Sequence, residues 1–412
     1  MLRSMFSAVS GLRANQTKLD VTGNNIANVN TVGYKGSQTV FQDTLSQVIR
    51  AGGAPAQSRG GTNPAQVGLG VKVAAITTNW TQGATQSTGR ATDFMIEGDG
   101  FFVTRSGNEQ TFTRAGSFEF DGQGKLVTPD GSVLQGWMAK PDGTVNTNGP
   151  ITDLSVPYGQ VVNPIASTTS SLGGNLPANK PAGEVVQTAI RMFDQQGVAH
   201  DVSYTFTKDA TDDWNLDVAI DGTPAPLDAV GMEDVTFNPD GSMATPAAPS
   251  IVSFTPDPLT YPGWPGPVTI DLSSIDQFGG SSTVQATEQD GFALGSLQSF
   301  TLGNDGTITG IYSNGMRQPL GQLALASFNN PSGLEKAGNS SFRVGDNSGA
   351  AMIGLAGVAG RGVLNSGALE MSNVDLAEEF TGLIVAQRGF QANSRVITAS
   401  DEILQDLVNL KR

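Results

Sequence analysis

The stretch GNNIANVNTVGYK, residues 23–35, places four asparagines where a predicted N-terminal helix comes to its end. Asparagine is a poor helix former, because its side-chain amide competes for backbone hydrogen bonds. A buried amide that finds no partner costs about 1 to 3 kcal/mol, so amides on a packing face favour one register. We expect Asn24, Asn25 and Asn28 to set the register of this helix against its neighbours. The alternative is that the four asparagines only cap and end one helix.

The end of the N-terminal helix is predicted at Asn30 and Gly33. Asn tolerates and Gly favours the left-handed conformation that commonly closes a helix. The chain then passes at Tyr34 into a connector. Upstream, the sequence has helical periodicity, with a heptad seam that contains one Gln and one Gly. The seam consists of Leu2, Met5, Val9, Leu12, Gln16, Leu19, Gly23 and Ile26.

The C-terminal segment, residues 372–412, has the same periodicity. We expect this helix to begin at a cap, Ser372, with Asp375 in the first turn, and to end at Lys411 and Arg412, where the charges suit the helix dipole. Its seam consists of Leu376, Phe380, Leu383, Gln387, Phe390, Ser394, Ile397, Asp401, Leu404 and Val408.

A second apolar stripe lies on the C-terminal helix, displaced around it from the first. One partner helix cannot cover both stripes. We therefore expect the terminal helices to pack against copies of themselves; the alternative is that the β domains of the same chain cover this face. The second stripe consists of Ala392, Val396, Ala399, Ile403, Leu407 and Leu410.

The long middle region is predicted to be β. It is rich in Gly, Thr, Val, Asp and Pro, and Asp-Gly turn signals between alternating apolar residues favour antiparallel hairpins. The fold class is therefore mainly β with terminal α-helices, in a discontinuous multidomain chain. We expect a helical polymerisation domain (1–33 plus 371–412), a connector (34–70 plus 351–370), a first β domain (71–148 plus 286–350) and an inserted outer β domain (149–285).

Composition limits the functions that the 412-residue chain can have. Asp and Glu number 38 against 23 Lys and Arg, a formal charge of -15, so the chain repels phosphate backbones and anionic lipid. No run of apolar residues is long enough to span a membrane, and the N-terminus lacks the features of a cleaved secretory signal. The chain has no cysteine, which excludes disulfides and thiolate metal sites. Nucleic acid and membrane insertion are therefore not expected.

Motifs that might carry chemistry are weak. The stretches EGDGFF and FDGQGKLVTPDG lack the ligand spacing of a calcium loop and are better interpreted as hairpin turns. His200 is the only histidine, which excludes multi-histidine metal sites. Acidic pairs such as Asp212-Asp213 lie beside turn residues and define no cleft. We expect no catalytic, metal-binding or cofactor-binding residues, and no enzyme activity.

Three motifs resemble one family, the bacterial flagellar rod and hook proteins. GNNIANVNTVGYK resembles the N-terminal motif of this family, EGDGFFVTRSG at 97–107 resembles its next signature, and LIVAQRGFQANSRVITASDEILQDLVNL at 383–410 resembles its C-terminal helix. The inserted stretch MFDQQGVAHDVSYTFTK and the overall length are similar to the hook members, because the rod members are shorter.

The resemblance implies a structural role outside the cell. It implies export through the flagellar type III apparatus without a cleaved signal, and self-assembly into a short curved tube that joins the motor to the filament. Its implied partners are copies of itself, the distal rod, the hook cap, the hook–filament junction protein and the export apparatus. The alternatives are a distal rod subunit of the same family and, in a different class, a secreted β-rich carbohydrate-acting enzyme or adhesin.

The candidate functional residues lie at the two ends of the chain. Gly33 and Tyr34 are the expected helix end and connector. The expected subunit interface comprises Met5, Val9, Leu12, Leu19, Asn24, Asn25, Ile26, Asn28, Leu376, Phe380, Leu383, Phe390, Val396, Ile397, Ile403, Leu404, Leu407 and Val408.

Overall fold

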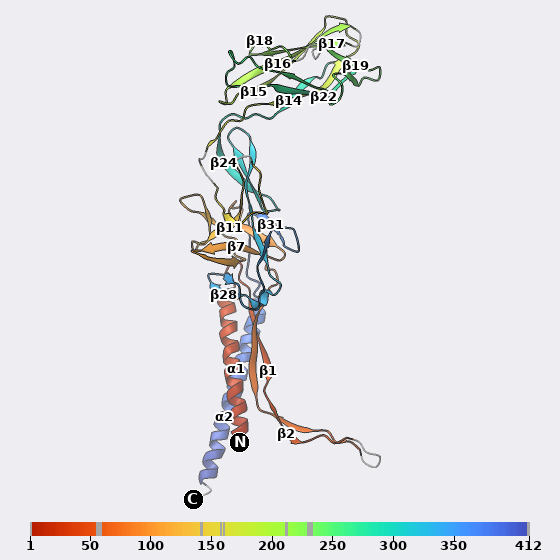
Figure 1. Cartoon of the computed structure of the whole chain (residues 1–412). Helices are drawn as coiled ribbons and strands as arrows, with labels where there is room; N and C mark the ends of the chain where they lie inside the picture. The colour runs from red at the N-terminus through yellow and green to blue at the C-terminus, as the bar shows by residue number, and fades with distance from the viewer. Residues whose placement is uncertain are drawn as a thin grey trace. The chain divides into compact units, whose positions relative to one another are not determined.

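The computed structural model describes residues 2–54, 60–140, 143–156, 159, 161–210, 213–228 and 234–409, without the side chains of residues 2, 210 and 407–409. Two long helices, α1 (Leu2–Ala27) and α2 (Leu376–Asn409), enclose a long run of strands in the sequence (Figure 1). The predicted class, mainly β with terminal helices, is confirmed. Lys411 and Arg412, the predicted basic end of the second helix, lie outside the described residues.

The chain divides into two compact units. The first comprises residues 1–156, 300–309 and 319–412, and the second comprises residues 157–299 and 310–318. The second unit begins and ends later in the chain than the expected inserted domain. The finer division into four parts stays a prediction.

The first unit contains α1, α2 and strands from both halves of the chain. Its strands are β1 (Ser37–Asp43), β2 (Ser46–Arg50), β3 (Ala65–Gly68), β4 (Val71–Thr78), β5 (Thr85–Ser87), β6 (Phe94–Glu97), β7 (Phe101–Ser106), β8 (Glu109–Thr113), β9 (Glu119–Phe120), β10 (Leu126–Val127), β11 (Val133–Met138), β12 (Thr152–Asp153), β27 (Leu325–Ser327), β28 (Glu335–Gly338), β29 (Ser341–Arg343), β30 (Met352–Gly354), β31 (Val363–Ser366) and β32 (Ala368–Glu370), with a 3-10 turn at Pro331–Gly333.

The second unit consists of strands. They are β13 (Val161–Val162), β14 (Thr169–Pro177), β15 (Val185–Phe193), β16 (Ala199–Ala210), β17 (Asp213–Ile220), β18 (Thr223–Pro224), β19 (Asp234–Phe237), β20 (Met243–Thr245), β21 (Ile251–Phe254), β22 (Val268–Phe278) and β23 (Gln285–Gln289). The division between the units falls within β24 (Gly295–Leu302), β25 (Thr307–Tyr312) and β26 (Arg317–Leu323).

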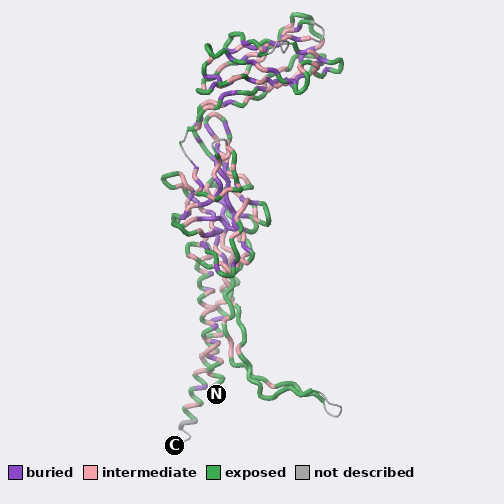
Figure 2. The backbone as a smooth tube through the Cα atoms, viewed as in Figure 1, coloured by how far each residue is buried: buried purple, intermediate pink, exposed green. Residues whose placement is uncertain are grey.

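A strand ribbon follows α1 directly. β1 pairs antiparallel with β4, from Ser37 opposite Thr78 to Asp43 opposite Val71, and β2 pairs with β3 farther along the same ribbon. Its residues are mostly exposed, green in Figure 2, and they include large apolar side chains such as Leu45 and Ile49. The first part of the expected connector, residues 34–70, therefore contains regular β structure: β2 pairs with β3 within it, and β1 pairs with β4, which begins at Val71 in the expected first β domain.

The core of the first unit is a cluster of aromatic side chains on the central sheet, in which β11, β7, β8, β29 and β28 are neighbours in that order. Phe101, Phe112, Phe328 and Phe342 pack there, and the rings of Phe112 and Phe328 meet edge to face with centroids 4.9 Å apart. Edge-to-face packing is a favoured arrangement of aromatic rings.

The second unit closes a large core between a four-stranded and a six-stranded sheet. Tyr204 and Phe206 of β16 lie opposite Val218 and Leu216 of β17, and all four side chains are buried, as the alternating sequence predicts. β14 and β22 pair in parallel, which differs from the expected antiparallel hairpins. Their connection runs through the other sheet of the unit, so no tight turn is required between them.

Candidate functional site

The two terminal helices lie side by side and contact each other through small and polar residues (Figure 1). A Cβ added to Gly11 would lie 2.7 Å from Asn393 Nδ2, and one added to Gly389 would lie 3.0 Å from Asn15 Nδ2. Ala386 of α2 is fully buried. The residues of α1 that are buried are Ala8, Gly11, Ala14, Thr22 and Asn25. Small side chains let the helix axes approach closely, and half-buried members of the predicted apolar seam, such as Leu383 and Ile397, flank this contact.

The predicted apolar residues lie beside this contact and remain accessible. On α1 the half-buried members are Met5, Val9, Leu12, Leu19 and Ile26; on α2 they are Leu383, Ile397 and Leu404. The exposed members, all on α2, are Leu376, Phe380, Phe390, Val396 and Ile403. The side chains of Leu407 and Val408 lie outside the described residues. Whether these residues contact other subunits stays a prediction.

Three exposed apolar residues of the helices were missed by the seam rule. Phe6 on α1 is 71% exposed, and Ile384 and Val385 on α2 are 56% and 58% exposed. All three are one or two positions away from a predicted seam residue, so they point to other sides of the helices than that residue does. A window that scored the whole helix circumference for apolar residues could have found them.

The asparagines of the quoted stretch act within the chain. Asn25 is 1% exposed; its Nδ2 donates to Glu379 Oε1 of α2 at 2.7 Å and to the Ser37 carbonyl at 2.8 Å, and its Oδ1 accepts from the Ser37 amide. Asn28 bonds the carbonyl of Asn24 at the helix end. The amide of Asn25 therefore joins α1, β1 and α2 of one chain. This differs from the expected contact between subunits, because its bonding capacity is used internally.

α1 ends earlier than predicted. Gly33 lies beyond the helix, and glycine is needed there for a reason other than ending it. α1 ends at Ala27, and Gly33 has φ of +66°, a conformation that glycine adopts without strain. Its amide donates to the Glu370 carbonyl at 2.8 Å, and a Cβ there would lie 2.5 Å from the Ala115 nitrogen. Gly33 is therefore required for the close approach of three chain segments.

Tyr34 connects the helix end to the β sheet. Its hydroxyl donates to Asn24 Oδ1 at 2.7 Å, and Lys336 Nζ lies 5.6 Å from the centre of its ring. Burial, together with the nearby Glu379 carboxylate, raises the pKa of Tyr34. The phenol therefore remains neutral at physiological pH and serves as a hydrogen-bond donor.

A buried ion cluster lies beneath this junction, and the sequence analysis did not identify it. Lys35 Nζ lies 2.6 Å from Glu370 Oε1 and donates to the Thr81 carbonyl at 2.8 Å; Arg114 Nη1 lies 3.5 Å from Glu370 Oε2. The Lys35 and Glu370 side chains are fully buried. Burial lowers the pKa of Lys35, although the adjacent Glu370 carboxylate acts in the opposite direction. The only sequence signal is Lys35 itself, the last residue of the motif GNNIANVNTVGYK.

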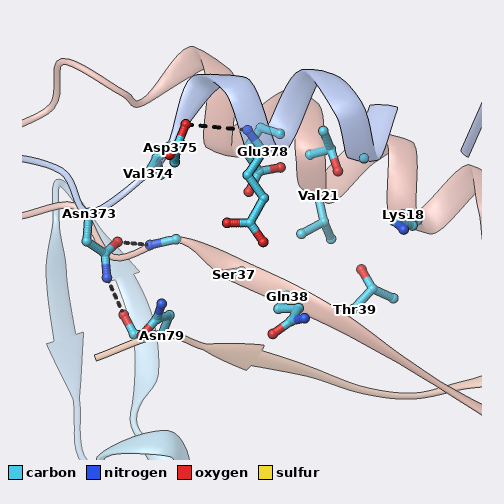
Figure 3. A pocket seen from close by; sticks show the side chains of 14 residues that line it. Lys18, Val21, Ser37, Gln38, Thr39, Asn79, Asn373, Val374, Asp375 and Glu378 are labelled. Atoms are coloured by element: carbon cyan, nitrogen blue, oxygen red, sulfur yellow. Dashed lines mark hydrogen bonds between the residues drawn. The ribbon is translucent and has the colours of Figure 1, made fainter. Parts of the chain in front are cut away.

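The beginning of α2 borders a small polar hollow of about 190 Å³, shown in Figure 3. Asp375 caps the helix, because its Oδ1 accepts from the Ala377 amide at 2.8 Å; the predicted cap, Ser372, lies outside the helix. Asn373 Nδ2 donates to the Asn79 carbonyl, and its Oδ1 accepts from the Gly36 amide. Lys18 of α1 lines the same hollow.

Two further findings concern chemistry at this site. Among the described residues, no group of three or more His, Cys, Asp or Glu side chains is placed to hold a metal ion. No helix in the described part of the chain is long and apolar enough to cross a membrane.

Family comparisons cover most of the chain. The family described as "Flagella basal body rod protein" matches residues 5–35, and "Flagellar hook protein FlgE/F/G D1 domain" matches residues 95–163. "Flagellar basal body protein FlaE D2 domain" matches residues 163–292, and "Flagellar basal body rod FlgEFG protein C-terminal" matches residues 365–410. The chain belongs to the flagellar rod and hook protein family.

Whole-chain relatives narrow the comparison within the family. The chain is 40% identical to the flagellar hook protein FlgE of Borreliella burgdorferi and 39% identical to that of Treponema pallidum, each over 100% of both chains. It is 33% identical to the flagellar basal-body rod protein FlgG of Bacillus subtilis, also over 100% of both chains. A crystal structure of the Helicobacter pylori flagellar hook protein FlgE2 shares the fold, with a TM-score of 0.51 and 14% identity over 68% of this chain and 99% of that one. The predicted family is confirmed.

Proposed function

We propose that the chain is a structural subunit of the flagellar hook that self-assembles into a flexible tube between the motor and the filament. One observation carries the proposal. The face between α1 and α2 is already filled by small and polar residues, while apolar side chains such as Phe380, Ile384 and Ile403 remain exposed. Exposed apolar faces of this extent mark interaction surfaces in soluble proteins. Two such faces, one at each end of the chain, are best suited to contact other copies of the same chain.

The subunit interface that we propose uses the expected residues other than Asn25, whose amide is occupied within the chain. The proposed partners beyond other copies are the distal rod, the hook cap, the hook–filament junction protein and the type III export apparatus, with export that needs no cleaved signal. No catalytic activity forms part of this role.

The experiment compares assembly by purified full-length variants. Phe390→Asp and Ile403→Asp each place a charge on an apolar face, which costs several kcal/mol if that face becomes buried against another subunit. We expect both variants to lose polymers in pelleting and electron microscopy. Gln405→Asp, an exposed polar control on the same helix, should assemble nearly as wild type.

The outcomes separate the proposal from its alternatives. Normal tubes from both variants would show that these faces do not form the polymer. A second candidate, a distal rod subunit, is favoured by the full-length match to a rod protein. Curved polymers support the hook role, whereas straight polymers support the rod role.

A further inference from the structure

The buried ion cluster joins four separate parts of the first unit. Lys35 follows the turn after α1, Thr81 and Gly83 precede β5, Arg114 follows β8, and Glu370 ends β32. The Glu370 carboxylate contacts three of these parts: it pairs with Lys35 and with Arg114, and its Oε1 accepts from the Gly83 amide at 3.0 Å. The Glu370 carbonyl also accepts from the Gly33 amide. Glu370 therefore contacts each of the other segments of the junction.

The charges of the cluster show why Glu370 is needed to keep Lys35 and Arg114 buried. Two cations, Lys35 and Arg114, are buried, and Glu370 is the carboxylate that pairs directly with both. Asp99 also acts on both cations, but the described residues show no ion pair between it and either of them. Removing one partner of a buried pair leaves an uncompensated charge, which is strongly destabilising. Without Glu370, the lysine and the arginine cannot both remain buried.

The two ends of the chain meet at this point. Lys35 and Glu370 are separated by 335 positions in the sequence, yet their side chains are in contact. Three residues beyond Glu370, Asn373 bonds the Gly36 amide and the carbonyls of Asn79 and Thr81. α2 begins at Leu376, directly after these anchors. The residues that orient the start of α2 are thus the ones that hold the segment following α1.

We infer that Glu370 is a latch that fixes the terminal helices to the β sheet only after the C-terminal segment has docked. Until that carboxylate arrives, Lys35 stays in solvent and the junction between α1 and β1 stays open. The aromatic core of the central sheet is formed by other residues, among them Phe101 and Phe112, and the cluster reaches it through Arg114, whose guanidinium carbon lies 5.3 Å from the centre of the Phe101 ring. The inference concerns the single chain and does not depend on which polymer it forms.

The test is hydrogen exchange on monomeric full-length protein. Glu370→Gln keeps the shape of the side chain but removes the charge that balances the two cations. We expect exchange of the amides of residues 33–37 and 81–85 to rise by at least about tenfold, and that of the β7 and β8 amides to rise far less, since only Arg114 of the described cluster contacts that sheet. The matched control is Glu119→Gln, which removes one partner of the exposed Arg90–Glu119 pair. It should leave the exchange of all these amides unchanged.

The outcomes are distinct. Unchanged exchange at the junction in Glu370→Gln would overturn the latch, and so would an equal increase at β7 and β8, because Glu370 would then be an ordinary core residue. If Glu370→Gln does not give folded protein, Lys35→Met provides the second measurement on its own. It leaves Glu370 paired with Arg114 and removes the buried cation that follows α1, so exchange of the amides of residues 33–37 should rise while that of the β7 and β8 amides does not. Unchanged exchange at residues 33–37 in Lys35→Met would contradict the inference.

Discussion

In the second unit the large side chains of β16 and β17 are buried between two sheets, whereas on α2 side chains of similar size lie in contact with solvent. Trp214 and Tyr204 have no exposed area, but Phe380 and Ile384 are half exposed. The second unit has the closed core of an independent domain. The helix pair has its own contact, but this contact uses Gly, Ala and Asn and leaves the apolar residues outside.

This difference shows that apolar residues serve two purposes in one chain. In the second unit they stabilise the fold of the monomer, since removal from water is the main favourable term in folding. On the helices, the same residue types contribute little to the monomer. Substitutions in the two regions should therefore affect different properties: the stability of the monomer in the second unit, and assembly on the helices.

The largest effect is expected from Trp214→Ala in the second unit. Its ring is buried against both sheets, and Lys208 Nζ lies 5.5 Å from its centre. Truncation leaves a cavity, so the free energy of unfolding of this unit should fall by about 3 to 5 kcal/mol. Hydrogen exchange of the β16 and β17 amides in the full chain measures this loss. Val185→Ala on the neighbouring strand β15 is the control, because Val185 is exposed. If both variants lose equal stability, the core is not closed as described.

A smaller effect is expected from Gly33→Ala at the helix junction. The new methyl group would be attached to a backbone with φ of +66° and would lie 2.5 Å from the Ala115 nitrogen. The junction should lose more than about 1 kcal/mol, since Ala is strained where φ is positive. Faster amide exchange at residues 33–37, with no change in the second unit, is the expected result.

The control for Gly33 is another glycine of the same segment. Gly23 lies in α1, and a Cβ there would meet no atom within 4 Å. Gly23→Ala should stabilise α1 by up to about 1 kcal/mol, because Ala is the better helix former. A stabilising effect of Gly33→Ala would mean that the close approach at the junction does not hold.

A third effect, confined to the second unit, depends on pH. His200 Nδ1 lies 2.7 Å from Asp221 Oδ2, and this hydrogen bond holds the pKa of Asp221 below its ordinary value. A depressed carboxylate pKa contributes stability that is present above about pH 4 and is lost as the pH falls through the lowered value. His200→Leu should therefore destabilise the second unit at pH 5 and less so at pH 2.

The control for the pH effect is Arg191→Leu, which removes an exposed cation near Asp201 without contacting Asp221. Unfolding monitored by calorimetry at both pH values gives the comparison. If the two variants lose the same stability at each pH, the contact between His200 and Asp221 makes no pH-dependent contribution.

The sequence could predict the second unit better than the helix junction. Alternation of Val202, Tyr204 and Phe206 is a local pattern, and the structure buries all three. The helices were also predictable from local periodicity. The partner of Asn25, by contrast, is Glu379, which lies 354 positions away in the sequence. Contacts of this kind depend on how the whole chain folds, and no local spacing encodes them.

The small residues in the face between α1 and α2 were not predicted, for a related reason. Periodicity identifies apolar stripes, but it does not say which stripe faces the partner within the chain. Gly11 and Gly389 carry no apolar signal, yet they permit the closest approach of the two helices, against Asn393 and Asn15. A rule that also searched for small residues at helical spacing would have found this contact.

The smallest effect on the monomer is expected from polar substitutions on the exposed face of α2. Phe380→Ser and Ile384→Ser replace side chains that are half exposed, and surface changes of this kind usually alter stability by less than about 0.5 kcal/mol. Monomer unfolding should therefore be nearly unchanged, although assembly should weaken, because each subunit loses apolar area that the polymer would bury. Calorimetry on the monomer and sedimentation after induced assembly measure the two properties separately.

A buried residue of the same helix sharpens the comparison. Ala386 has no exposed area and faces α1, so Ala386→Ser should destabilise the helix pair itself through a hydroxyl without room or partner. Its effect should appear in exchange of the α1 and α2 amides before any assembly. If Phe380→Ser and Ile384→Ser disturb those amides as much as Ala386→Ser does, the exposed face is already part of the folded monomer. The separation between the fold-stabilising core and the assembly face would then be wrong.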